Sequence, residues 1–181
     1  MIEPLSRFCS IYCTPDQYSE KNPEGFYTVN SLYFDTPNYL FLHKRLDGSE
    51  NRFNMRVRTY DDQSLPCFLE IKQKRVDIIR KYRAIVHDRE WYRMFDTPGY
   101  RIDTGEGTRN ESNKHLFYRM AYTHNIEPVV LTTYRRRAYE SVVDDYARIT
   151  FDKDLKFQPA EGFNLVPDAE QTIPYDNSAQ G

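Results

Sequence analysis

The sequence predicts an α+β fold built mainly on an antiparallel β-sheet, and two observations predict it. Three segments, at residues 52–58, 68–74 and 147–152, alternate polar and mostly basic residues with apolar ones. Because successive side chains of a strand point to opposite faces, each segment has one apolar face and one charged face. Aromatic residues make up 15% of the chain, which also favours strands.

The first part of the chain is expected to carry a helix, a loop, a strand and a second helix. The opening segment is mildly amphipathic, and Pro15, Pro23 and Gly25 interrupt the polar stretch that follows it. The predicted bounds are a helix over 3–13, a loop over 14–25, a strand over 26–34 and a short helix over 37–46.

The remaining elements begin with an antiparallel meander, because the polar turn at 61–64 joins two of the alternating segments. We expect strands over 52–60, 67–75 and 78–87, a helix over 88–97, a loop over 98–110, a helix over 111–124, a strand over 129–139, a turn at Asp144 and Asp145, and a strand over 146–152. Three prolines after residue 157 predict an irregular tail over 158–181, so the folded domain is expected over 1–157.

Composition narrows the class of protein. The chain has 181 residues and a net charge of −2, which suits one globular domain and argues against a general nucleic-acid binder. Positive charge is concentrated in 44–93 and 135–156, which favours a local anion site. The odd set Cys9, Cys13 and Cys67 lacks metal-site spacing, so we expect reduced thiols and a cytoplasmic location. No apolar run approaches the roughly 20 residues of a membrane span.

The charged faces of the predicted strands suggest a binding site for several phosphates. Arginine grips phosphate oxygens in a bidentate manner and lysine acts as a point charge, so several such strands would form a cationic wall. The faces group Arg52 with Arg56 and Arg58, Lys72 and Lys74 with Glu70, Lys81 with Arg83, and Arg148 with Asp152. Glu70 and Asp152 could hold a divalent cation that bridges the phosphates. For any single strand, a solvated outer face explains the pattern better than a binding site does. For all the strands together a binding site is the better explanation, because basic residues outnumber acidic ones on the charged faces, whereas a solvated face usually mixes the two signs.

Five blocks of the chain, in order, resemble the VTC domain, the catalytic domain of vacuolar-transporter-chaperone polyphosphate polymerases. The blocks are 27–36, 51–60, 68–72, 134–139 and 147–152. The resemblance implies a triphosphate tunnel, which is a closed antiparallel β-barrel with a basic interior and helices packed outside. It also implies transfer of the γ-phosphate of ATP to a growing polyphosphate chain, assisted by Mn²⁺ or Mg²⁺.

The resemblance assigns roles to individual residues. It implies that the catalytic cage consists of Arg56, Arg58, Lys72, Arg136 and Arg148, with Lys81 and Tyr134 also binding phosphate. Lys74 and Arg83 join this set from the strand faces. Among the arginines of 135–137, the alternation alone leaves the register open, whereas the resemblance selects Arg136.

Two family features are not matched, and they leave alternatives open. Members begin with a strand containing Glu and Lys and end with a Glu-Ile-Lys strand that binds metal, so we expect an incomplete barrel. The polymerase hypothesis therefore stands beside an inorganic triphosphatase and a non-catalytic module that binds polyphosphate or triphosphate. The expected partners are ATP, triphosphate or polyphosphate, without nucleic acid; any membrane association would come from another protein.

Overall fold

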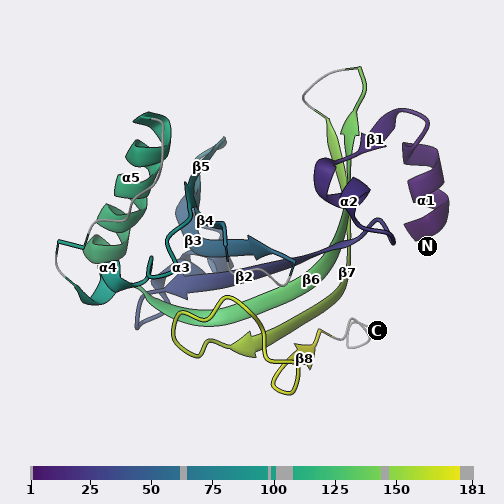
Figure 1. The fold of residues 1–181 in the computed structure, drawn as a ribbon. Coiled ribbons are helices and arrows are strands. Elements are labelled where there is room, and N and C mark those ends of the chain that lie inside the picture. The colour runs from purple at the N-terminus through teal and green to yellow at the C-terminus, as the bar shows by residue number, and fades with distance from the viewer. Residues whose placement is uncertain (1, 62–64, 98, 101–107, 144–146, 176–181) are drawn as a thin grey trace.

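The computed structural model describes residues 2–61, 65–97, 99–100, 108–143 and 147–175, and it is dominated by one antiparallel sheet (Figure 1). The strand order is β5-β4-β3-β2-β6-β7-β8, and β1 pairs separately with β6. The strands are β1 (Cys13–Pro15), β2 (Tyr27–Asp35), β3 (Asn51–Tyr60), β4 (Cys67–Arg75), β5 (Ile78–Val86), β6 (Glu127–Ser141), β7 (Arg148–Pro159) and β8 (Ile173–Pro174). The helices are α1 (Ile2–Cys9), α2 (Gln17–Lys21), α3 (Leu40–Leu46), α4 (Arg93–Asp96) and α5 (Thr108–His124).

The sheet is strongly curved, and in the part of the chain that the structure describes it does not close into a barrel. Figure 1 shows β3, β4 and β5 rising on one side and the ends of β6 and β7 rising on the other, so that the sheet has a concave face. Within the described ranges, β5 and β8 lie at opposite ends of the strand order and are not paired with each other. The predicted antiparallel α+β fold is confirmed, and its barrel is open, as expected.

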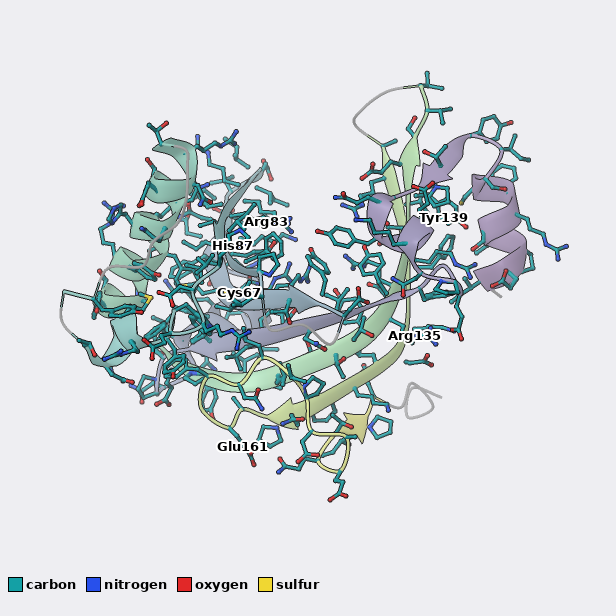
Figure 2. The ribbon with its side chains drawn as sticks, in the orientation of Figure 1. Cys67, Arg83, His87, Arg135, Tyr139 and Glu161 are labelled. Atoms are coloured by element: carbon teal, nitrogen blue, oxygen red, sulfur yellow. The ribbon has the colours of Figure 1, made fainter. Side chains whose placement is uncertain are left out.

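One face of the sheet forms the main hydrophobic core. It packs against α4, α5 and the irregular segment after β7, and Figure 2 shows side chains filling the space between α5 and the nearest strands. The buried residues of this core include Leu32, Phe34, Met55, Val57, Leu69, Ile71, Trp91, Met94, Phe117 and Leu165. Strands β3 and β4 contribute every second residue to the core, so the intervening residues of each strand lie on the concave face.

The concave face is polar at its centre and is covered at one end by α2. Tyr18 of α2 stacks on Tyr60 of β3 with ring centres 4.8 Å apart. Asp16 begins α2 as its N-cap and accepts the backbone N–H of Ser19 at 2.9 Å. The helix is held on the sheet by Ser19 as well, whose hydroxyl accepts the backbone N–H of Ala138.

The structure corrects several predicted elements near the N-terminus and after β5. The first helix ends at Cys9, and the predicted loop over 14–25 contains α2 and most of β1. In place of a helix over 88–97 there is only the short helix α4. Pro15, which the sequence suggests as a breaker, lies at the end of β1, directly before the N-cap of α2, where its missing N–H does no harm.

The C-terminal part departs from the prediction because tertiary pairing extends it. Strand β7 runs to Pro159 instead of ending at 152, since it pairs with β6 as far as Val130. The predicted tail contains β8, and Leu165 within it is buried in the core. The predicted domain boundary at residue 157 lies inside β7. The extent of the domain stays a prediction. Most of the predicted loop over 98–110, the turn at Asp144 and Asp145, and part of the turn at 61–64 lie outside the described residues.

No helix in the described ranges is both long enough and apolar enough to cross a membrane. The three cysteines are buried and unpaired.

Candidate functional site

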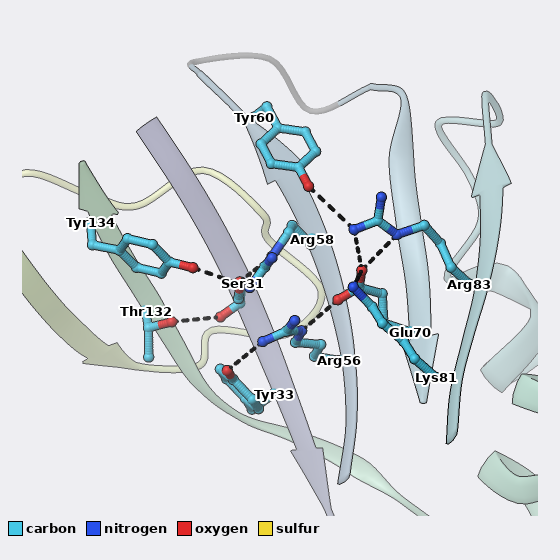
Figure 3. A network of polar contacts seen from close by, with 10 residues as sticks. All are labelled: Ser31, Tyr33, Arg56, Arg58, Tyr60, Glu70, Lys81, Arg83, Thr132 and Tyr134. Carbon is cyan, nitrogen blue, oxygen red and sulfur yellow. Dashed lines mark hydrogen bonds and ion pairs between the residues drawn. The ribbon is translucent and has the colours of Figure 1, made fainter. Parts of the chain in front are cut away.

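A buried carboxylate surrounded by basic side chains lies at the centre of the concave face. The strand register places Glu70 of β4 directly between Arg56 of β3 and Arg83 of β5. Its Oε2 accepts the Nε–H of Arg56 at 2.7 Å, and its Oε1 accepts the Nε–H of Arg83 at 2.7 Å. Lys81 approaches the same Oε1 to 3.2 Å. Three predicted phosphate-binding residues are thus gathered on one carboxylate (Figure 3).

Glu70 remains ionised despite its burial. Its side chain is only 2% exposed, and burial alone would favour the neutral acid. The positive charges of Arg56 and Arg83 overcome that effect and lower the pKa of Glu70 to about 2. The centre of the face therefore holds a permanent negative charge among positive ones.

Each arginine of this group is also held by a hydroxyl. Arg56 donates to the hydroxyl of Tyr33 at 2.9 Å, and Arg83 donates to that of Tyr60 at 3.4 Å. Arg58 is 4% exposed and donates to Ser31 and to Tyr134. A guanidinium group has five N–H donors, so two contacts to the protein fix its orientation and leave donors for an anion. Figure 3 shows these arginines converging from neighbouring strands.

The cationic face continues onto β6 and β7, where each arginine has its own acidic partner. Arg136 binds Asp152 through two N–H···O bonds of 2.7 Å, and this hydrogen bonding raises its pKa. Its guanidinium carbon lies 5.2 Å from the ring centre of Tyr134, which links it to the central group. Arg148, the first residue of β7, donates a guanidinium N–H to the buried Asp16 at 2.6 Å. Arg136 and Tyr134 lie on the same face of β6, because their positions differ by two.

At the other end of the face, a pocket of about 370 Å³ is lined by four basic residues. These are Arg45, Arg52, Lys72 and Lys74, and the lining also includes aromatic residues of β2, β3 and α3. Among the described residues, no carboxylate is ion-paired with any of the four cations. Asp35 also lines the pocket, but its oxygens accept backbone N–H groups at the start of α3.

The register of the strands brings these cations close to one another. Lys72 lies opposite Lys81, and Arg52 lies opposite Lys74. Like charges placed this way repel one another, so this end of the face favours an added anion.

The carboxylates of the concave face are poorly arranged for a metal ion. Both oxygens of Glu70 and both oxygens of Asp152 accept hydrogen bonds from arginine. In the described part of the chain, no group of three or more His, Cys, Asp or Glu residues could hold a metal. Arginine side chains thus occupy both carboxylates, and a metal site at Glu70 or Asp152 stays a prediction.

Several residues of the site are not among those predicted from the sequence. Ser31, Tyr33 and Tyr60 hold the arginines through their hydroxyl groups. The alternation along β2 places Ser31 and Tyr33 on one face, and this signal is present in the sequence. The role of Asp16 depends on contacts with Tyr27 and Arg148, which no local pattern reveals.

Comparisons with known proteins place the chain in a family. No curated protein matches the sequence. Among solved structures, a candidate adenylate cyclase from Bacillus halodurans matches with a TM-score of 0.43 and 10% identity, over 84% of this chain and 75% of that chain. A model of the VTC domain family matches residues 1–179. Because this match spans almost the whole sequence, the chain belongs to the VTC domain family.

Proposed function

We propose that this protein binds a linear chain of phosphates along its concave face and, with ATP, lengthens polyphosphate. The observation that carries the proposal is the continuous run of cationic groups from the pocket at Lys72 and Lys74, through the arginines around Glu70, to Arg136. A phosphate chain carries roughly one negative charge per phosphate, so an extended row of cations suits it better than a single cluster would.

The two ends of this row suit different parts of the reaction. The pocket combines cations with the aromatic rings of Tyr39, Phe41 and Phe53, which suits a nucleoside triphosphate with a flat base. The arginines beyond it would hold the receiving chain in line with the γ-phosphate. Phosphoryl transfer depends chiefly on such positioning and on charge neutralisation.

We also propose that Mn²⁺ or Mg²⁺ enters the site bound to the phosphate oxygens of the nucleotide. The carboxylates on the face are held by arginines, whereas such ions commonly bind through substrate phosphates.

The proposal is tested with purified protein, ATP and Mn²⁺, followed by gel analysis of long-chain polyphosphate and by calorimetric titration with tripolyphosphate. We expect polyphosphate to accumulate and tripolyphosphate to bind. Arg56→Ala should abolish synthesis. Absence of tripolyphosphate binding by folded protein would overturn the proposal.

A second candidate, a polyphosphate-binding module without turnover, is favoured by the engagement of Glu70 and Asp152 with arginines. In the same experiment it would bind tripolyphosphate but form no chain. A triphosphatase would instead release phosphate from tripolyphosphate without chain growth. If DNA displaces polyphosphate from the protein, and if this displacement weakens sharply as the salt concentration rises, the protein is a nucleic-acid binder.

A further inference from the structure

We propose that Glu70 is a positioning residue that serves as a resident counter-ion: it holds Arg56 and Arg83 in the ligand-free protein and yields them to the phosphate chain on binding. This inference rests on the proposed binding of a phosphate chain. It concerns how the site accepts its ligand.

The first argument is the competition that the contacts impose. Arg56 and Arg83 each direct their Nε–H to Glu70, which uses both carboxylate oxygens. A phosphate that takes a bidentate grip on either guanidinium through its Nε–H must replace the carboxylate there. Binding through these Nε–H groups is therefore an exchange of one anion for another, and Glu70 weakens it.

The second argument is that the arginines, and not the glutamate, have room to turn. The Glu70 side chain is 2% exposed, whereas those of Arg56 and Arg83 are 22% and 37% exposed. The guanidinium groups can therefore rotate toward a chain on the open side while the carboxylate stays in place. Arg58, which is tied to Ser31 and not to Glu70, needs no such movement.

The third argument is that a partner remains for the carboxylate after the exchange. Lys81 lies 3.2 Å from Oε1 of Glu70, and its side chain is 49% exposed. When the arginines turn to phosphate, Lys81 can keep the buried negative charge neutralised. The arrangement avoids an unpaired buried carboxylate, which would be strongly unfavourable.

The test is the Glu70→Gln variant, which keeps the shape of the side chain and removes its charge. We expect Glu70→Gln to bind tripolyphosphate about tenfold more tightly than the wild type, because a negative charge a few ångströms from the ligand is gone. Its melting temperature without ligand should fall, and saturating tripolyphosphate should raise it by more than in the wild type. Glu70→Asp keeps the charge and should not gain affinity.

Glu24→Gln is the matched control, because it removes a carboxylate that pairs with Arg135, on the opposite face of β6 from Tyr134. Its affinity should equal that of the wild type. Unchanged or weaker binding by folded Glu70→Gln would overturn the inference, provided that the wild type binds. A wild type that does not bind would instead overturn the proposed function.

A measurement on the wild type covers the case in which Glu70→Gln does not fold. The Nε–H resonances of Arg56 and Arg83, assigned by NMR, should shift strongly during titration with tripolyphosphate as these groups leave the carboxylate. Resonances that stay at their ligand-free positions at saturation would contradict the exchange.

Discussion

Arg58 donates a guanidinium N–H to the hydroxyl of Tyr134 at 3.2 Å, although strand β2 lies between their two strands. This contact joins residues 76 positions apart in the sequence. It connects the arginines around Glu70 with Arg136, whose guanidinium lies over the ring of Tyr134. The basic residues of β3, β4 and β5 are thereby connected across β2 to those of β6 and β7.

We predict that Tyr134→Phe weakens tripolyphosphate binding by about three- to tenfold, equivalent to roughly one hydrogen bond. Burial raises the pKa of Tyr134, so its hydroxyl keeps a proton that it can donate to a phosphate while it accepts from Arg58. Calorimetric titration measures the change. Tyr122→Phe, which removes a hydroxyl bonded to Met94 of α4, is the control and should bind normally. Equal affinity of Tyr134→Phe and the wild type would contradict the role.

Lys72→Ala should lower affinity without lowering stability. Lys72 lies opposite Lys81 and lines the pocket, so its loss relieves repulsion between like charges and removes a charge that the phosphates need. We expect an affinity about tenfold lower, as for the loss of one strong ionic contact, with an unchanged or slightly higher melting temperature. Thermal unfolding and titration measure both quantities. Arg80→Ala, on the opposite face of β5, should leave affinity unaltered.

The parts of this site that depend on alternation within one strand were predictable from sequence. Arg56 and Arg58 share a face because their positions differ by two, and the same holds for Lys72 and Lys74. The sharing of Glu70 by residues of β3 and β5 was not predictable, because it depends on the register between three strands.

The elements that were missed owe their existence to contacts distant in sequence. The second half of β7 pairs with Leu131 and neighbouring residues of β6, and its own sequence has only a weak alternation. Helix α2 is short, and it is held by its N-cap Asp16 and by the contact of Ser19 with Ala138. Local propensity is a weak guide where tertiary contacts provide most of the stability.

The stability contributed by Glu70 should disappear in acid. Its pKa falls from an ordinary value of 4.5 to about 2 on folding, so its ionised form stabilises the protein by about 3 kcal/mol above pH 5. This contribution is lost as the pH falls from about 5 towards 2, because the unfolded state takes up the proton first. Wild type and Glu70→Gln should therefore differ most in unfolding free energy near neutral pH and converge at about pH 2. A constant difference between them across this range would be inconsistent with the lowered pKa.

Asp16 should contribute to stability through three contacts, and two substitutions can separate its helix cap from its charge. It accepts the backbone N–H of Ser19, the hydroxyl of Tyr27 at 3.2 Å and a guanidinium N–H of Arg148 at 2.6 Å. Asp16→Ala removes all three and should cost about 2–3 kcal/mol, the sum of a lost helix cap, a lost hydrogen bond to Tyr27 and a partly exposed ion pair. Asp16→Asn keeps a capping oxygen and should cost less. Urea unfolding measures both variants, and equal losses would show that the cap contributes nothing beyond the charge.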